Sequence, residues 1–279
     1  MNLKLSDQIN FYYEFKDWYS QILEDFKFDF IKECESRDYL SQIFFKKKSQ
    51  KWNLETVLSQ FKEIISLKPM ILIYGCGPSL EKTFNIILKR KGVNFFKNFI
   101  NLTADGASTL LRKKRVQIDA IFTDLDGITK NEFKYARFNV VHAHGDNREK
   151  LNLFKNEIIK FENIIGTTQI EPTRNVLNPG GFTDGDRILY FLRTLLQPFH
   201  KLFLIGMDFG TIIGKYSKLD LIHNQKASPI KLKKLQYAIK LIRWISDKID
   251  NKICLVNSEC KTRDFPNLSI ETFLKFFNI

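Results

Sequence analysis

The 279-residue chain has few of the features that mark several classes of protein. Its four cysteines are scattered, without Cys-x-x-Cys spacing or a nearby histidine, so neither a disulfide framework nor a zinc site is indicated. The longest apolar runs have the length of strands and fall well short of the ~20 residues that a membrane helix needs. The first ten residues contain no apolar signal-peptide segment. These absences predict a soluble, cytoplasmic protein.

The chain does have a surplus of apolar and of basic residues. Hydrophobic residues make up 44% of it, including 26 Phe, so it can bury a large core. Residues 1–70 hold 11 Lys and Arg against 11 Asp and Glu, so the net charge of +13 arises entirely in residues 71–279. Such a basic surface attracts RNA or a polyphosphate, or is merely solvated. The charge alone leaves these readings open.

The first part of the chain has the pattern of amphipathic helices. From residue 9 to about residue 66, aromatic and aliphatic residues recur at steps of three and four, and a second helical pattern covers residues 53–67. We interpret the aromatic stripe as packing and predict a helical N-terminal cap, residues 1–68. The cap is also a candidate surface for a homodimer.

After residue 68 the pattern changes to short apolar runs that alternate with amphipathic stretches. Such alternation is typical of βαβ units, and runs without polar interruption indicate strands buried on both faces. We therefore predict an α/β catalytic domain, residues 69–279, with a mostly parallel, Rossmann-like sheet and helices on both faces. The expected strands lie in residues 70–75, 99–104, 118–123, 138–144, 161–167, 201–207 and 252–258.

Nearly every expected strand ends in glycine and polar residues, and ligands bind beyond the carboxyl ends of the strands in an open parallel sheet. The endings are GCGPSL (75–80), ADGA (104–107), TDLDG (123–127), HAHGDN (142–147), GTTQ (166–169) and GMDFG (206–210), together with the loop NPGGFTDGDR (178–187). Six or seven such endings on one edge predict a binding site there.

The first ending, residues 75–80, leads from a strand into a helix. Ser79 is a candidate N-cap, and the free N–H groups of that first turn are suited to a phosphate. The residues match neither the GxxxxGK[ST] loop nor the full GxGxxG fingerprint. An anion site and a simple strand-to-helix turn both remain open.

The ending TDLDG supplies the clearest candidate for chemistry. Asp124 and Asp126 are two residues apart and so lie on the same side of the chain. With Asp105 and Asp146 from neighbouring strand ends they form a set of hard oxygen ligands, which Mg²⁺ prefers when substrate phosphates complete its shell. The alternative is a solvated turn with a helix-capping aspartate.

Other polar residues are more ambiguous. His144, and less so His142, is a candidate to orient a phosphate or a ring or to bind a metal. Asp184 and Asp186 are candidates for further ligands, although Asp184 equally suits a helix cap, and Asp208 at a later strand end has the same ambiguity.

A lysine-rich helix begins near residue 228, with Ser228 as N-cap and Pro229 as its first residue. Lys231, Lys233 and Lys234 crowd the first turn, where the helix dipole disfavours cations. A bound anion relieves this conflict, so we expect one or two of these lysines to reach ATP phosphates.

In their order along the chain these motifs resemble those of the archaeal-type 6-hydroxymethyl-7,8-dihydropterin pyrophosphokinases, relatives of thiamine pyrophosphokinase. The resemblance implies Mg²⁺-dependent transfer of pyrophosphate from ATP to the pterin hydroxymethyl group, with release of AMP, in folate- or methanopterin-type biosynthesis. It implies that Asp124 and Asp126 hold the metal, with Asp105 and Asp146 as further catalytic carboxylates. The residues expected to bind substrate or nucleotide are Gly75, Gly77, Pro78, Ser79, Gly106, His144, Thr167, Thr168, Gly181, Asp184, Asp186, Asp208, Lys231 and Lys234.

Two further expectations concern the substrate. A buried carboxylate is expected at the amino-pyrimidinone edge of the pterin, with Asp184, Asp186 and Asp208 as candidates, and Cys76 is interpreted as filler rather than a nucleophile. A carboxylate pair that holds a metal also suits a nucleotide-sugar-dependent transferase, like the related motility-associated proteins. An RNA-binding module fits less well, because no RNA motif is present and acidic strand ends repel a phosphate backbone.

Overall fold

The computed structural model describes residues 3–48, 52–260 and 262–277. At its centre is a nine-stranded sheet in the order β11-β10-β7-β1-β2-β3-β4-β5-β6, and all its neighbouring strands run parallel. The strands are β1 (Met70–Tyr74), β2 (Ile100–Ala104), β3 (Ala120–Thr123), β4 (Phe138–Ala143), β5 (Ile164–Thr168), β6 (Val176–Leu177), β7 (Lys201–Ile205), β10 (Ile253–Val256) and β11 (Asn267–Leu268).

All seven strands expected from the apolar runs are present, and the predicted α/β class is confirmed. The other two, β6 and β11, have two residues each and extend the sheet at its two edges. Nearly every residue of the longer strands is buried, because helices cover both faces.

From β1 the strand order runs through β2 to β6 in one direction, and through β7 to β11 in the other, which places the connecting helices on opposite faces of the sheet. Connections between parallel strands are right-handed, so the helices that link β1 to β5 share one face, and α10 and α11, on the return path to β7 and β10, lie on the other. The helices of the first set are α5 (Leu80–Lys91), α6 (Ala107–Lys113), α7 (Lys130–Tyr135), α8 (Arg148–Leu153) and α9 (Lys155–Lys160), with the 3-10 turn η1 (Val93–Asn98). The return helices are α10 (Asp184–Leu192) and α11 (Pro229–Ser246), and α12 (Ile270–Lys275) follows β11.

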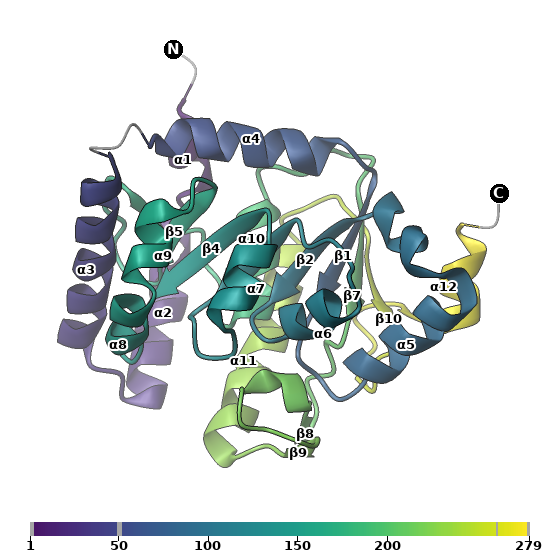
Figure 1. Ribbon diagram of the computed structural model, residues 1–279. Helices are drawn as coiled ribbons and strands as arrows, with labels where there is room; N and C mark the ends of the chain where they lie inside the picture. Colours follow the sequence, from purple (N-terminus) through teal and green to yellow (C-terminus); the bar gives the residue numbers. More distant parts are fainter. Residues whose placement is uncertain (1–2, 49–51, 261, 278–279) are drawn as a thin grey trace.

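The predicted N-terminal helical region is present as four helices: α1 (Leu5–Ile9), α2 (Tyr12–Phe26), α3 (Phe30–Lys48) and α4 (Leu54–Ser66). Helix α3 runs beside α8 and α9, where Lys47 Nζ donates to the carbonyl of Ile159 (2.9 Å), and α4 lies along the amino edge of the sheet (Figure 1). One hydrophobic cluster includes side chains of α2, α4 and every long strand. Residue 68 therefore separates two sequence patterns that share one core.

A small lobe lies beyond the carboxyl ends of the strands, at the bottom of Figure 1. It consists of the antiparallel pair β8 (Ile212–Ile213) and β9 (Gln225–Lys226) with the short turn η2 (Lys215–Ser217). Glu81 of α5 holds it, since one carboxylate oxygen accepts from the Tyr216 hydroxyl (3.0 Å) and the other pairs with Lys215 (2.7 Å). No helix formed by the described residues is long and apolar enough to cross a membrane.

Candidate active site

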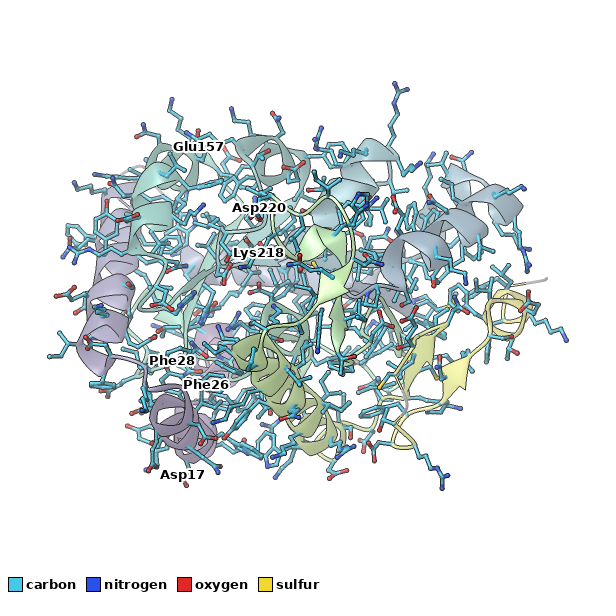
Figure 2. All side chains as sticks on the ribbon, turned by 90° about the horizontal axis from the view of Figure 1, so that it is seen from below. Asp17, Phe26, Phe28, Glu157, Lys218 and Asp220 are labelled. Atoms are coloured by element: carbon cyan, nitrogen blue, oxygen red, sulfur yellow. The ribbon has the colours of Figure 1, made fainter. Side chains whose placement is uncertain are left out.

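A cavity of about 510 Å³ lies between the carboxyl edge of the sheet and the β8–β9 lobe. This is the region where the strand order reverses, as β7 returns to the far side of β1. Figure 2 views the molecule from this side, with Lys218 of the lobe near the middle and Phe28, from the α2–α3 connection, to its left; both residues line the cavity. The walls therefore come from segments between residues 28 and 235.

The structure sorts the expected site residues into two groups. Ten of them line the cavity: Gly75, Gly77, Asp105, Asp124, Asp126, His144, Asp184, Asp208, Lys231 and Lys234. Eight lie outside its lining: Pro78, Ser79, Gly106, Asp146, Thr167, Thr168, Gly181 and Asp186.

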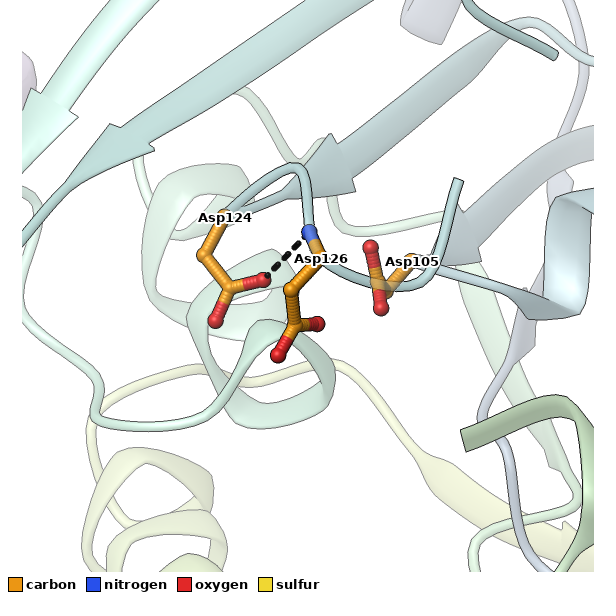
Figure 3. A group of neighbouring side chains, drawn as sticks. All are labelled: Asp105, Asp124 and Asp126. Atoms are coloured by element: carbon orange, nitrogen blue, oxygen red, sulfur yellow. Dashed lines mark hydrogen bonds between the residues drawn. The ribbon is translucent and has the colours of Figure 1, made fainter. Parts of the chain in front are cut away.

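Three carboxylates gather at the ends of β2 and β3. One oxygen from each of Asp105, Asp124 and Asp126 lies within 4.8 Å of the other two (Figure 3). Thr123 fixes this arrangement, since its hydroxyl donates to Asp105 Oδ1 (2.7 Å) and accepts from the backbone N–H of Leu125 (2.7 Å). Asp105 and Leu125 both have positive φ (44° and 73°). The chain is thus bent twice to bring the three side chains together.

The carboxylates of this trio repel one another, which a proton or a bound cation would relieve. Burial and the neighbouring carboxylates raise the pKa of Asp105 well above its usual range, and burial with the charge of Asp124 raises the pKa of Asp126 to about 6. Burial acts in the same direction on Asp124, but the hydrogen bond and charge of His144 outweigh it and lower the pKa of that carboxyl. Three close oxygen donors on one side of an open cavity fit Mg²⁺, which keeps positions free for phosphate and water.

His144 is held beside the trio by its own loop. Its Nε2 lies 3.4 Å from Asp124 Oδ2, and its backbone N–H donates to Asn147 Oδ1 (3.1 Å). The Asn147 amide also donates to the carbonyls of Asp124 (2.9 Å) and His142 (2.6 Å), which ties the ends of β3 and β4 together. From α3, Glu33 Oε1 accepts from the N–H of Gly145 (2.9 Å).

The prediction for Asp146 needs a correction. Its side chain is exposed, and among the described residues it belongs neither to the carboxylate cluster nor to the cavity lining. In the turn between β4 and α8 the N–H of Asp146 donates to His144 Nδ1 (3.3 Å), so His144 lines the cavity while the Asp146 side chain is exposed.

The glycine turn after β1 also differs from the expectation of a phosphate site. Ser79 occupies the N-cap position without a side-chain cap, and its N–H and hydroxyl donate to the buried Asp208 carboxylate (2.9 and 2.7 Å). The other donors to Asp208 are the hydroxyl of Ser258 (2.9 Å) and the N–H of Glu259 (2.8 Å). The anion at this helix start is therefore a side chain of the protein, and Asp208 has four donors already. A Cβ on Gly77 would lie 2.2 Å from Asp208 Oδ2, so the turn needs glycine.

The loop before α10 distinguishes the two alternatives for Asp184 and gives Asp186 a capping role. Thr183, not Asp184, is the N-cap, and it forms a capping box with Asp186, whose oxygens accept from the N–H groups of Phe182 (2.6 Å) and Thr183 (2.8 Å). Asp184 faces the cavity and pairs with Arg187 (2.8 Å). Burial and the charge of Asp124 raise the pKa of Asp184 to about 8.

Helix α11 begins as expected, with the Ser228 hydroxyl accepting from the N–H of Lys231 (3.2 Å) and Pro229 at its first position. Lys231 and Lys234 line the cavity, whereas Lys233 pairs with Asp25 at the end of α2 (3.1 Å). The first turn therefore divides its lysines between the cavity and the N-terminal helices.

Four of the expected residues, Thr167, Thr168, Gly181 and Gly106, pack within the fold outside the cavity lining. Thr167 lies 3.0 Å from His142 Nδ1 through its hydroxyl, and Thr168 is also buried. Gly181 has φ 84°, and a Cβ there would lie 2.7 Å from the Arg187 backbone. Gly106 packs against the lobe, since a Cβ added at this position would lie 2.0 Å from the Tyr216 carbonyl oxygen. Burial raises the pKa of the Cys76 thiol, which agrees with its interpretation as filler.

The sequence did not single out several lining residues. They are Phe28, Gln169, Phe182, Arg187 and the apolar side chains Phe209, Ile212, Ile213, Ile230 and Leu235. Gln169 and Arg187 belong to motifs that were recognised, GTTQ and GGFTDGDR, so their position beside polar strand ends was a usable signal. Phe28 lies in the N-terminal region and carried no such signal.

Comparisons with known proteins identify the family of the chain. Residues 46–214 match the family model described as 6-hydroxymethylpterin diphosphokinase MptE-like. Proteins named 6-hydroxymethyl-7,8-dihydropterin pyrophosphokinase are similar over most of their length. The protein from Methanocaldococcus jannaschii is 38% identical over 250 residues, which are 85% of this chain and 98% of that protein. The one from Pyrococcus furiosus is 32% identical over 242 residues, 86% of this chain and 96% of that protein.

A third relative of the same name, from Methanothermobacter thermautotrophicus, is 35% identical over 85% of this chain and 95% of its own length. The solved structure of the MAf glycosyltransferase from Magnetospirillum magneticum AMB-1 covers 74% of this chain and 34% of that chain, with 14% identity and a TM-score of 0.44, and this likeness is too weak to carry an argument. The family resemblance expected from the motifs, and with it an enzyme of the diphosphotransferase class, is confirmed: the chain belongs to the 6-hydroxymethylpterin diphosphokinase MptE-like family.

Proposed function

We propose that the protein transfers pyrophosphate from ATP to the hydroxymethyl group of 6-hydroxymethyl-7,8-dihydropterin, which yields the pterin diphosphate and AMP. The reaction depends on Mg²⁺ and serves folate- or methanopterin-type cofactor biosynthesis. The observation that carries this proposal is the shared cavity of Asp105, Asp124 and Asp126 with two lysines, in a chain of this family.

The three carboxylates are the residues that would hold the metal, which supplies positive charge for the phosphates when it is bound. Lys231 and Lys234 add charge from the first turn of α11, and His144 keeps Asp124 ionised. Attack of a hydroxyl on the β-phosphorus needs in-line positioning and charge neutralisation more than covalent catalysis. These residues provide both functions without a nucleophile of the protein.

Product analysis tests the proposal. The protein is incubated with ATP, Mg²⁺ and the hydroxymethyl-dihydropterin, beside thiamine and a nucleotide sugar as competing acceptor and donor. We expect AMP and a pterin diphosphate from the wild type and their loss in Asp126→Asn. A matched control is Asp17→Asn, because Asp17 is exposed on α2, far from the carboxylates in sequence and outside the cavity lining. Release of ADP, or no transfer to the pterin by folded protein, would refute the assignment.

A further inference from the structure

Three buried side chains of the cavity wall have polar atoms without a partner. His142, Gln169 and Arg187 are at most 3% exposed and line the cavity, yet His142 Nε2, Gln169 Oε1 and Arg187 Nε have no hydrogen-bond partner among the described residues. Buried polar groups are nearly always paired, because an unpaired one loses its hydrogen bonds to water and gains none from the protein. Three such atoms on side chains that line one cavity therefore indicate a ligand that pairs with them.

The other polar atoms of Arg187 and His142 fix the positions of these two side chains. Arg187 uses Nη1 for Asp184 and Nη2 for the carbonyl of Phe182, both at 2.8 Å, and its Nε is the nitrogen without a partner among the described residues. His142 is held by the Thr167 hydroxyl through Nδ1 (3.0 Å), and burial with the charge of Arg187 lowers its pKa far below the usual range, so its ring is neutral. Gln169 follows Thr167 by two residues at the end of β5, and its free atom is an acceptor.

The same end of the cavity has aromatic walls. The rings of Phe28 and Phe182 lie 6.3 Å apart, and Lys234 Nζ lies over both, at 5.5 and 5.7 Å from their centroids. Aromatic faces with a few fixed donors and acceptors are the surroundings of a flat, polar heterocycle.

This end also connects to the carboxylate trio. The His142 and His144 rings are stacked with centroids 6.1 Å apart, and His144 reaches Asp124 at 3.4 Å. A heterocycle that contacts His142 therefore lies near His144, and through it near Asp124 of the carboxylate trio.

We infer that the wall of His142, Gln169 and Arg187 reads the amino-pyrimidinone edge of the acceptor, and this inference rests on the proposed function. The Gln169 carbonyl accepts from the ring N–H and amino group, and Arg187 Nε donates to the ring carbonyl. Of the three expected carboxylate readers, Asp186 accepts from the N–H groups of its own loop, and Asp208 accepts from the N–H groups of Ser79 and Glu259. The third, Asp184, pairs with Arg187, so we assign the edge to an amide instead. The hydroxymethyl group then lies on the side of Asp124.

The test separates binding of the ring from turnover. Binding of 6-hydroxymethylpterin, the fluorescent oxidised form, is titrated without ATP for the wild type, Gln169→Leu and Gln169→Glu. We expect Gln169→Leu to weaken binding about 10- to 100-fold, the effect of an unpaired group at the ring edge. Gln169→Glu keeps the acceptor and should retain binding. Gln236→Leu, on the exposed part of α11, is the control.

A second readout uses an analogue whose 2-amino group is replaced by oxygen. Its binding should be weaker in the wild type, and Gln169→Leu should weaken it less than it weakens pterin binding, because only the ring N–H is left to donate to Gln169. The inference is overturned if folded Gln169→Leu binds the pterin as the wild type does, or if the wild type binds no pterin. Wild-type binding that depends on Gln169, but without transfer from ATP, would refute the proposed function and leave the ring site standing.

Discussion

Substitution of Gly127 by alanine tests the carboxylate trio without replacing any of its three aspartates. An ideal Cβ at this position lies 1.9 Å from Asp105 Oδ2 and 2.8 Å from its Cγ, whereas ordinary contacts begin near 3.4 Å. The φ of Gly127 lies outside the left-handed region, so the backbone accepts alanine and the carboxylate has to move by about 1.5 Å. This movement breaks the hydrogen bond from Thr123.

The expected result is a large loss of activity with a small loss of stability. One broken hydrogen bond costs about 1 kcal/mol of folding free energy, whereas a displacement of about 1 Å at a reacting centre costs about 100-fold in rate. Release of AMP at saturating ATP and pterin, measured over a range of Mg²⁺ concentrations, gives the rate and the Mg²⁺ requirement, and urea unfolding gives the stability.

Gly210→Ala is the matched control, because the nearest atom to its added Cβ lies 3.9 Å away. It should retain wild-type rate and Mg²⁺ dependence. Wild-type kinetics of Gly127→Ala would show that the position of Asp105 does not matter for the reaction and would refute our assignment of the trio.

Three further predictions follow from individual contacts. Chelation with EDTA should abolish transfer and Mg²⁺ restore it, and Asp105→Asn should raise the Mg²⁺ requirement by about tenfold or more; an unchanged requirement argues against Asp105 as a ligand. Ser228→Ala removes the N-cap of α11 and should cost about 1 kcal/mol in urea unfolding, and an unaltered midpoint contradicts this. Burial lowers the pKa of Lys47 in the native state from its ordinary value of 10.5 to about 8. The buried charge therefore destabilises the native state below pH 8, and this destabilisation disappears as the pH rises from 8 to 10.5. Wild-type stability relative to Lys47→Met should therefore increase between these values, and a difference constant with pH would contradict it.

The sequence was most informative about features that depend on neighbouring residues. Seven strands were recognised because strands buried on both faces read as unbroken apolar runs, and the Asp124–Asp126 pair because it follows one of them. The two-residue strands β6 and β11 are too short to produce a pattern.

Contacts between distant residues were not predictable in this way. Ser79 appeared to begin a helix with free N–H groups, but Asp208, 129 residues away, accepts from it. Phe28 appeared to be ordinary helix packing, and only the folded chain brings it to the cavity. Asp146 follows a strand as Asp126 does, but its side chain is exposed, whereas Asp126 lines the cavity.

The positions of the cavity walls along the chain have a consequence for how such enzymes diverge. The three carboxylates lie within residues 105–126, at the ends of the adjacent strands β2 and β3, whereas the aromatic and polar wall is assembled from residues near 28, 142, 169 and 182–187. Under the proposed function, mutations in the second set would alter the acceptor without changing the carboxylates proposed to hold the metal. Acceptor preference in this architecture can thus drift during evolution while the phosphoryl-transfer chemistry is inherited intact.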